Sequence, residues 1–394
     1  MYTSRRLRWA LAAATVGALV LTGCSTGSNG SKSSGNGSPA NSGGSSSDIS
    51  SAVLANIQKY MGPSTFTAPG PAIDVSTLKG KKIFDIPSVA NPFLQSISAA
   101  MEQVANKVGM VYTRFDNQSQ VSQWVQGINQ AIASKQDIIV LNGAPDPRAL
   151  QPQLAAAKAA NIPVVVMHFH DNSAPLPPAC EGCTNVTATV SAPFNDAGKA
   201  AADWIIKDSG DKANVLIVGG SDILPSPGTI DTMTKEFTAE CPKCTTKVTN
   251  IPVADWNTKT QGVVQSALQA NPNVNYVYVL YDAMVAGAVP AVTTLGKKIK
   301  IVSYNGSPFA LDDIRNSSGN TVAMDVGEDT PGIGYATMDQ AFRILLGQAP
   351  VPERTPIRIW DKTNITEAGT PAKAGQGYGD VYVNGYLKLW GVSS

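Results

Sequence analysis

Histidine and cysteine are scarce in this sequence, and neither sign of charge dominates. Two histidines and five cysteines occur among 394 residues, and 30 basic against 29 acidic residues give a net charge of +1. Because there is no basic stripe, nucleic acid is not expected as a partner. No predicted strand leads into a Gly-x-Ser-x-Gly elbow, and no Walker motif or distinctly spaced carboxylate pair is present. We therefore expect neither an enzyme nor a cofactor.

The N-terminal apolar run is too short to span a bilayer. Residues 9–21 supply about 13 apolar positions, whereas a membrane-spanning helix needs about 20. Arginines within residues 5–8 precede this run, and Leu-Thr-Gly-Cys24 follows it. This order is typical of a signal peptide that ends in a lipobox. We predict that residues 1–23 are removed and that Cys24 carries a lipid, which places the protein on the outer face of the cell membrane.

Residues 24–50 are nearly all Ser, Gly and Asn, the composition of a flexible tether. Such a chain has a root-mean-square reach of roughly 25–30 Å. That reach would keep the following domain beside a membrane partner. The next segment, residues 51–61, reads SAVLANIQKYM. It either forms a short helix on the domain or continues the linker.

The other four cysteines form two CxxC pairs, Cys180/Cys183 and Cys241/Cys244. The two pairs could hold zinc, but they lie far apart in the sequence, and the leader exports the chain to an oxidising compartment where disulfides persist. Two local disulfides are the favoured interpretation. Crossed pairing and a structural metal remain alternatives.

The segment Lys81 to Leu94, KKIFDIPSVANPFL, organises the rest of the chain. Residues 83–86 read as a buried strand, residues 87–93 as a loop, and Pro92 opens an amphipathic helix to about residue 108. In open α/β sheets such a loop meets the ligand. It contains no glycine, so it does not form a dinucleotide-binding turn, and it suits a small neutral polar molecule.

Strand and helix patterns then alternate through two similar halves. Strands are expected at 81–86, 110–115, 137–141, 164–168, 213–219, 245–251, 275–280, 299–303 and 320–326. Helices are expected at 92–108, 119–134, 148–160, 192–208, 228–240, 258–270, 283–295 and 332–347. Strands such as Ile138-Ile-Val-Leu141 are continuously apolar, which predicts parallel sheets covered on both faces. Two such lobes leave a cleft between them, and clefts of this kind are preferred ligand sites.

A first strand followed by Asn91-Pro92-Phe93 at a helix start resembles the ribose-type (type I) periplasmic-binding family of sugar ABC importers, over roughly residues 80 to 350. The resemblance implies an α/β fold of two Rossmann-like, doubly wound lobes joined by a three-segment hinge. It places the first lobe at 80–190 plus 327–356 and the second at 191–326 plus 357–394. We expect residues 361–394 to pack on the second lobe through Trp390.

Candidate ligand residues lie at predicted strand ends or at matching family positions. They are Asn91, Phe93, Asn142, His168, Phe169, Asp231, Trp256, Tyr281, Asp282, Tyr304, Asn305 and Glu328. Several of them could instead have a purely structural role. Asn142 could be a turn residue, Asp282 a helix cap and Trp256 ordinary core.

Three positions depart from the family pattern. His168-Phe169 stand where ribose binders carry Asp-Arg, and Asn305 replaces a carboxylate. Asp231 is the polar residue nearest the position of a family arginine. On a strand, His168 and His170 would face the same side. His168 could contact the ligand, serve the structure, or join His170 and Asp171 in a metal site; no metal is our main expectation.

Aromatic faces with a few amides and carboxylates describe a site for a neutral polyhydroxy compound. The resemblance implies a substrate-binding lipoprotein of an ABC importer, whose lobes close on a small sugar or polyol and dock on a permease. We expect it to be monomeric. The alternatives are the same fold binding an amine or aromatic molecule, and a sensor lipoprotein that presents its ligand.

Overall fold

The computed structural model describes residues 49–143, 145–173, 184–220, 222–379 and 381–393. The predicted leader, most of the tether, Cys24 and the pair Cys180/Cys183 lie outside these ranges. Within them, no helix is both long enough and apolar enough to cross a membrane. The described residues belong to one compact unit, Ser46–Ser394.

The first sheet has five parallel strands in the order β2-β1-β3-β4-β5. The strands are β1 (Lys82–Pro87), β2 (Val111–Arg114), β3 (Ile138–Asn142), β4 (Val164–Asp171) and β5 (Ala188–Ala192). The helices that cover it are α2 (Pro92–Val108), α3 (Val121–Ala133), α4 (Gln151–Ala159) and α10 (Thr330–Leu345). Alternate strand residues enter two cores, one shared with α2 and α10 and the other with α3 and α4. The prediction of a parallel sheet covered on both faces is therefore confirmed.

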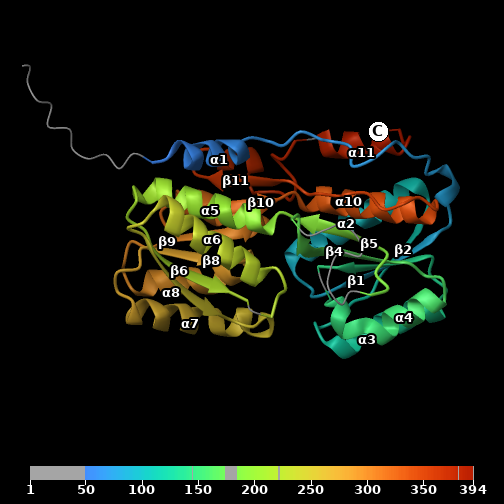
Figure 1. Ribbon diagram of the computed structural model, residues 1–394, viewed down its shortest axis with the longest axis horizontal. Helices are drawn as coiled ribbons and strands as arrows, with labels where there is room; N and C mark the ends of the chain where they lie inside the picture. Colours follow the sequence, from blue (N-terminus) through green and yellow to red (C-terminus); the bar gives the residue numbers. More distant parts are fainter. Residues whose placement is uncertain (1–48, 144, 174–183, 221, 380, 394) are drawn as a thin grey trace, which may run out of the picture. The chain divides into compact units, whose positions relative to one another are not determined.

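The second sheet has six strands in the order β11-β10-β9-β8-β6-β7. The strands are β6 (Asn214–Gly219), β7 (Thr245–Asn250), β8 (Tyr276–Val279), β9 (Lys300–Asn305), β10 (Val322–Glu328) and β11 (Ile357–Asp361). The helices around it are α5 (Phe194–Ser209), α6 (Ser226–Glu240), α7 (Trp256–Ala270), α8 (Val285–Thr294) and α9 (Pro308–Asn316). Helix α5 packs on α6, and α7 on α8 (Figure 1). Strand β11 is antiparallel to β10. The sequence patterns do not predict β5 or β11.

Three short segments connect the two sheets. Ala192 ends β5 and Phe194 begins α5; Glu328 ends β10 and Thr330 begins α10; the third segment precedes Ile357 of β11. Two of these segments touch, because Ser191 pairs with Arg354. Several chain connections between two lobes, two of them in contact, are the arrangement of a hinge.

The segment before the first strand forms helix α1 (Ser51–Met61), which packs on α5 and β11. Ser50 caps it by accepting from the Val53 backbone N–H at 3.2 Å, and Val53 and Ile57 are buried in the core of the second sheet. The question that the sequence left open is thereby settled in favour of a docked helix.

The last helix, α11 (Val381–Leu389), packs on α10. Trp390 stacks on Tyr335 at 5.7 Å, and its indole N–H donates to Asp339 at 2.7 Å. The expectation that the run to residue 394 packs on the second lobe through Trp390 is therefore wrong for this helix. The reason is that α10 presents apolar side chains and the buried Asp339 carboxylate, which accepts from the Trp390 indole as well as from Arg343.

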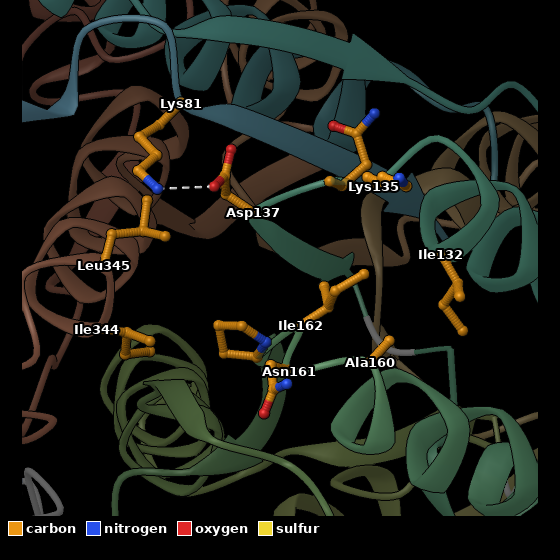
Figure 2. Close-up of a pocket in the computed structure, with 11 residues that line it drawn as sticks. Lys81, Ile132, Lys135, Asp137, Ala160, Asn161, Ile162, Ile344 and Leu345 are labelled. Atoms are coloured by element: carbon orange, nitrogen blue, oxygen red, sulfur yellow. Dashed lines mark hydrogen bonds and ion pairs between the residues drawn. The ribbon is translucent and has the colours of Figure 1, made fainter.

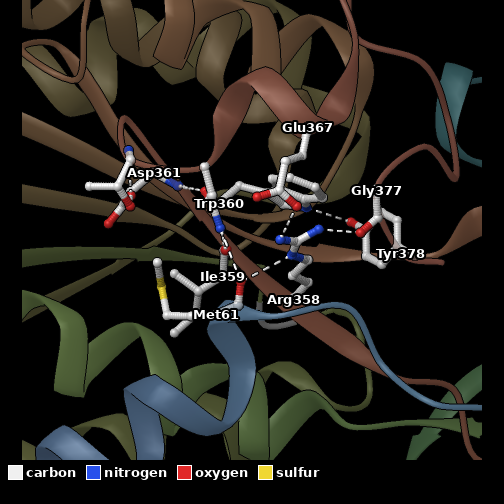
Figure 3. A network of polar contacts seen from close by, with 10 residues as sticks. Met61, Arg358, Ile359, Trp360, Asp361, Glu367, Gly377 and Tyr378 are labelled. Atoms are coloured by element: carbon white, nitrogen blue, oxygen red, sulfur yellow. Dashed lines mark hydrogen bonds and ion pairs between the residues drawn. The ribbon is translucent and has the colours of Figure 1, made fainter.

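Arg358 of β11 ties three separate segments together (Figure 3). Its guanidinium, 2% exposed, donates to the carbonyl oxygens of Met61 and Gly377 and to the carboxylate of Glu367. It lies 4.2 Å from the centre of the Trp360 ring, a cation–π contact. A single buried cation thus holds the end of α1 and the chain after β11 in place.

Cys241 follows the last residue of α6, Cys244 precedes β7, and the two residues are joined by a disulfide in the structure.

Candidate functional site

The carboxylate of Glu328 lies at the centre of a cluster of polar side chains at the carboxyl ends of the strands. Glu328 is the last residue of β10 and is 1% exposed. Its Oε2 lies 2.8 Å from His168 Nε2, which comes from β4 of the other sheet. The side chains of His168 and Glu328 are 9% and 0% exposed. The two residues therefore form a buried contact between the lobes.

His168 has a left-handed backbone conformation, with φ of 54°. The β4–β5 register is irregular between Met167 and Asp171, so the strand bulges at this residue. Histidine tolerates positive φ better than most side chains, and such conformations concentrate at functional sites. The expected alternation therefore fails: His168 contacts Glu328, whereas His170 packs against Phe169 at 4.8 Å.

Asn305 is the second residue that holds Glu328. Its Nδ2 donates to Glu328 Oε2 at 3.2 Å, and its φ is 130°. The following Gly306 also has positive φ, 72°. Two residues with unusual backbone angles, one from each sheet, thus direct their side chains to the same oxygen atom.

Two buried oxygen atoms beside this contact have no hydrogen-bond partner among the described residues. They are Glu328 Oε1 and the Tyr304 hydroxyl. Tyr304 is 1% exposed, and burial, then the negative charge of Glu328 and a side-chain hydrogen-bond interaction with Glu328, raise its pKa well above the usual value. The two side chains therefore lie near each other, although their free oxygen atoms do not meet in a hydrogen bond of ordinary geometry. Buried polar groups are normally paired, so these two atoms are candidates for a bound molecule.

A row of rings continues from one lobe to the other around these atoms. Its successive centroid separations are Phe93–His168 5.0 Å, His168–Phe194 4.8 Å, Phe194–Tyr304 5.9 Å, Tyr304–Tyr281 6.3 Å and Tyr281–Trp256 5.1 Å. The Trp256 and Tyr281 rings are stacked, and the Trp256 indole donates to the Ile251 carbonyl at 2.9 Å. The row gathers five predicted residues from the ends of five different strands, β1, β4, β7, β8 and β9.

Phe194 belongs to this row but was not among the predicted site residues. A signal for it exists in the sequence. Pro193-Phe194 opens α5 after β5, just as Pro92-Phe93 opens α2 after β1. A Pro-Phe pair thus lies at a helix start in both lobes, although Pro92 is the first residue of α2 and Pro193 is the residue before α5.

Asp282 fixes the loop that carries Asn305 and does not reach the row of rings by any described contact. Its Oδ2 accepts from the Ser307 backbone N–H at 2.6 Å. Burial and then the neighbouring Asp325 raise the pKa of Asp282 well above its usual range. Asp325 in turn accepts from the Gly306 N–H at 2.8 Å. The side chain does not cap a helix.

Asn91 and Asn142 have structural contacts. Asn91 caps α2 by accepting from the Leu94 N–H at 2.8 Å. Asn142 is fully buried and donates to Ser98 Oγ at 3.1 Å and to Asp85 Oδ2 at 3.4 Å. Burial raises the pKa of Asp85 to about 6, although hydrogen bonds from Ser98 and other groups act against the increase. This network is separate from the Glu328 contacts.

Phe169 and Asp231 are not brought to Glu328. Phe169 lies in the core between the first sheet and the helices α3 and α4, because the bulge at His168 turns the next side chain to that face. Asp231 lies on the solvent side of α6, 60% exposed, and pairs with Lys235 at 2.6 Å. Among the described residues, no group of His, Cys, Asp and Glu side chains is arranged to hold a metal ion.

A hollow of about 670 Å³ lies at the opposite edge of the first sheet, near the amino ends of β1 and β3 (Figure 2). Lys81 and Asp137 line it and pair at 2.8 Å. Apolar side chains such as Ile132, Ile344 and Leu345 complete its wall. The hollow is thus distinct from the contacts around Glu328.

The parallel first sheet, the mostly parallel second sheet, the three connections and the polar contact between the lobes define a two-lobed binding protein of the type I periplasmic kind. Residues 83–349 match the family described as periplasmic binding protein domain. The chain belongs to this family. The family is one of binding proteins and not of enzymes, as the sequence predicts.

Individual relatives are more distant. The chain is 25% identical over 263 residues to the ribose import binding protein of Bacillus subtilis, which covers 67% of this chain and 81% of the relative. It is 25% identical over 231 residues to the D-apiose import binding protein of Actinobacillus succinogenes, covering 58% of this chain and 70% of the relative.

Solved structures share the fold. An ABC transporter solute-binding protein from Agrobacterium vitis, bound with α-D-tagatopyranose, superposes with a TM-score of 0.64 at 19% identity, covering 73% of this chain and 96% of that one. A solute-binding protein from Mycobacterium smegmatis with bound glycerol gives 0.64 at 20% identity, covering 75% and 99%.

Proposed function

We propose that this chain is the extracytoplasmic substrate-binding lipoprotein of an ABC importer and binds a small sugar or polyol between its lobes. The observation that carries the proposal is the Glu328 contact. One carboxylate oxygen is held by a residue from each lobe, while Glu328 Oε1 and the Tyr304 hydroxyl stay buried and unpaired. A hydroxyl group can donate to the first and accept from the second.

The rings around these atoms favour a carbohydrate over an ionic ligand. Phe93, Phe194, Tyr281 and Trp256 offer apolar faces, which suit the C–H face of a sugar ring. No lysine or arginine forms a salt bridge with Glu328 in the described part of the chain, so the site has no ready partner for a phosphate or an organic acid. The relatives' own ligands, ribose, apiose, tagatose and glycerol, are neutral polyhydroxy compounds.

Ligand contacts are proposed for Phe93, Trp256, Tyr281, Tyr304, Asn305 and Glu328, with Phe194 added. A ligand that touches both lobes would favour their closure, because binding shifts the equilibrium toward the form with more contacts. The closed form would dock on the permease. The lipid on Cys24 and the tether would keep the monomeric receptor beside it.

A thermal-shift screen tests the proposal. Residues 24–394 with Cys24→Ser are heated with D-ribose, D-tagatose, D-allose, D-arabinose, glycerol, amines and aromatic acids. A sugar at 100 times its dissociation constant would stabilise the fold by about 2.7 kcal/mol, a rise of several degrees. Glu328→Gln should reduce the rise, and Asp231→Asn at an exposed carboxylate should leave it intact. A response to amines or aromatic acids alone would contradict the proposed ligand class.

A further inference from the structure

The two carboxylate oxygens of Glu328 have different surroundings. Oε2 receives His168 Nε2 at 2.8 Å and Asn305 Nδ2 at 3.2 Å, whereas Oε1 has no partner among the described residues. An ionised carboxylate only accepts hydrogen bonds, so a His168 tautomer with its hydrogen on Nε2 is the one that would hold the Glu328 carboxylate in this way. His168 and Asn305 together fix which oxygen of Glu328 remains available.

Among the titratable side chains near Glu328, His168 is the only one in the described part of the chain that can carry a positive charge opposite the carboxylate. In the described residues, His168 forms the ion-pair contact of Glu328, and the neighbouring titratable groups are Tyr304, Tyr281, Tyr378 and Asp325. None of these can be a cation. A buried carboxylate without compensation is costly, so the contact with His168 is needed for Glu328 to stay in place.

The imidazole ring of His168 is contacted by an aromatic ring on each side. Phe93 of α2 lies 5.0 Å from its centroid, and Phe194 of α5 lies 4.8 Å from it at a steep angle of 64°. Its positive φ fixes the direction in which the side chain leaves the strand. With 9% of its side chain exposed, the ring is enclosed by protein and its Nε2 is already engaged.

We infer that His168 is a positioning residue, which holds Glu328 across the lobes through Oε2 so that Oε1 is presented to a ligand hydroxyl group. This inference rests on the proposed function and changes one part of it. His168 acts on the ligand through Glu328 and is not itself a ligand contact. The histidine takes the place of a carboxylate in the ribose-type pattern, and its partner is a carboxylate in the other lobe.

A double-mutant cycle measured by isothermal titration calorimetry tests the inference, with D-ribose, D-allose, D-tagatose and glycerol as probes and residues 24–394 (Cys24→Ser) as the protein. His168→Asn tolerates the positive φ but is too short to reach Glu328, so the affinity should fall roughly 10-fold to 100-fold, the value of a hydrogen bond to a charged group. His168→Gln keeps an N–H of similar reach and should bind within about threefold of the unaltered chain. His170→Asn, at the other histidine, is the matched control and should bind unchanged.

The second arm of the cycle uses Glu328→Gln. Adding His168→Asn to it should change affinity less than about threefold, because the partner is already altered. If Glu328→Gln binds no probe, thermal unfolding supplies the same cycle. His168→Asn should then lower the melting temperature of the unaltered chain but not that of Glu328→Gln.

Equal affinities for His168→Asn and His170→Asn, or an equal loss in both Glu328 backgrounds, would overturn the positioning role while the proposed function stands. If the unaltered chain binds none of the probes, the proposed function fails and this inference with it.

Discussion

The ring of Phe66, which precedes the first strand, packs edge-on against Tyr386 of the last helix, with centroids 5.0 Å apart. The Ile73 backbone N–H, a few residues further on, donates to the Leu389 carbonyl at 2.8 Å. Both segments lie outside residues 83–349, the part that matches the family. The two ends of the described chain therefore pack on each other as well as on the lobes.

Phe66→Ala should lower the free energy of unfolding by about 1–2 kcal/mol, less than for a fully buried phenylalanine because Phe66 is only half-buried. Urea denaturation followed by circular dichroism measures the loss. Phe309→Ala is the matched control, since Phe309 is 37% exposed and its loss should stay near 0.5 kcal/mol. Equal losses would mean that the terminal packing contributes no stability.

Gly327→Ala should destabilise the second lobe by about 1–3 kcal/mol, the usual cost of overpacking. A methyl group there would collide with the Tyr378 hydroxyl and would lie 2.7 Å from the Trp360 indole nitrogen. Both partners are rings held by their own hydrogen bond at 2.9 Å. Gly262→Ala in α7 has open space around the new methyl group and should gain about 0.5–1 kcal/mol. A stable Gly327→Ala protein would contradict the packing described for β10.

Stability should fall as pH rises from about 4 to 7 because of Asp85. Burial raises its folded-state pKa from 3.8 to about 6, so the folded protein binds more protons than the unfolded chain in this range. The stabilisation that Asp85 contributes is fully present below about pH 4 and is lost as the pH rises through its folded-state pKa of about 6. A pKa shift of about 2 units corresponds to about 3 kcal/mol of unfolding free energy. Urea unfolding of the Asp85→Asn protein should show a flatter pH profile. Asp116→Asn, at an exposed carboxylate, should retain the slope of the unaltered chain.

Tyr304→Phe should weaken sugar binding about tenfold without lowering stability. The hydroxyl is buried and makes no hydrogen bond of ordinary geometry among the described residues, although it interacts with Glu328, so its removal should cost the free protein little and takes a hydrogen bond from the complex. Calorimetric titration with the sugar found in the screen, together with thermal unfolding, measures both effects. Tyr278→Phe removes another buried, unpaired hydroxyl outside the site and should leave binding unchanged. Equal binding by the two variants would exclude the Tyr304 hydroxyl from ligand contact.

Cys241 and Cys244 should form a disulfide in the exported protein. Mass spectrometry of an unreduced digest should find the peptide that contains both about 2 Da lighter than after reduction, as expected in an oxidising compartment. Labelling of both sulfurs by an alkylating reagent without prior reduction would contradict the pairing. The same digest would test the prediction for Cys180 and Cys183.

The sequence predicts much of the fold because strand burial is a local property. Continuous apolar runs such as Ile138 to Leu141 mark strands covered on both faces, and Pro92 after a capping Asn91 marks a helix start. Strand β5 escapes this reasoning because Ala188–Ala192 carries small residues, and β11 because Arg358 and Asp361 interrupt its apolar pattern. Their burial depends on partners elsewhere in the chain.

For the candidate site, too, local position along the chain selects some residues correctly by location but does not determine their contacts. Strand-end positions select Trp256, Tyr281, Tyr304 and Asn305, because the carboxyl ends of parallel strands meet along one edge. The same logic selects Asn142, which instead closes an internal network with Ser98 and Asp85. Position along a strand determines at which edge of the sheet a residue lies. The neighbouring helix determines whether the side chain finds its hydrogen-bond partners inside the lobe, as Asn142 does with Ser98 of α2.

By itself the sequence determined most of the succession of strands and helices, the balanced charge and the aromatic strand ends, since each depends on a local pattern. Only the tertiary structure decided that His168 meets Glu328, 160 residues away, and that Trp390 docks on α10. The physical reason is that both contacts depend on backbone geometry set by distant packing. A left-handed φ at His168 reverses the side that strand alternation predicts, and no local pattern encodes that reversal.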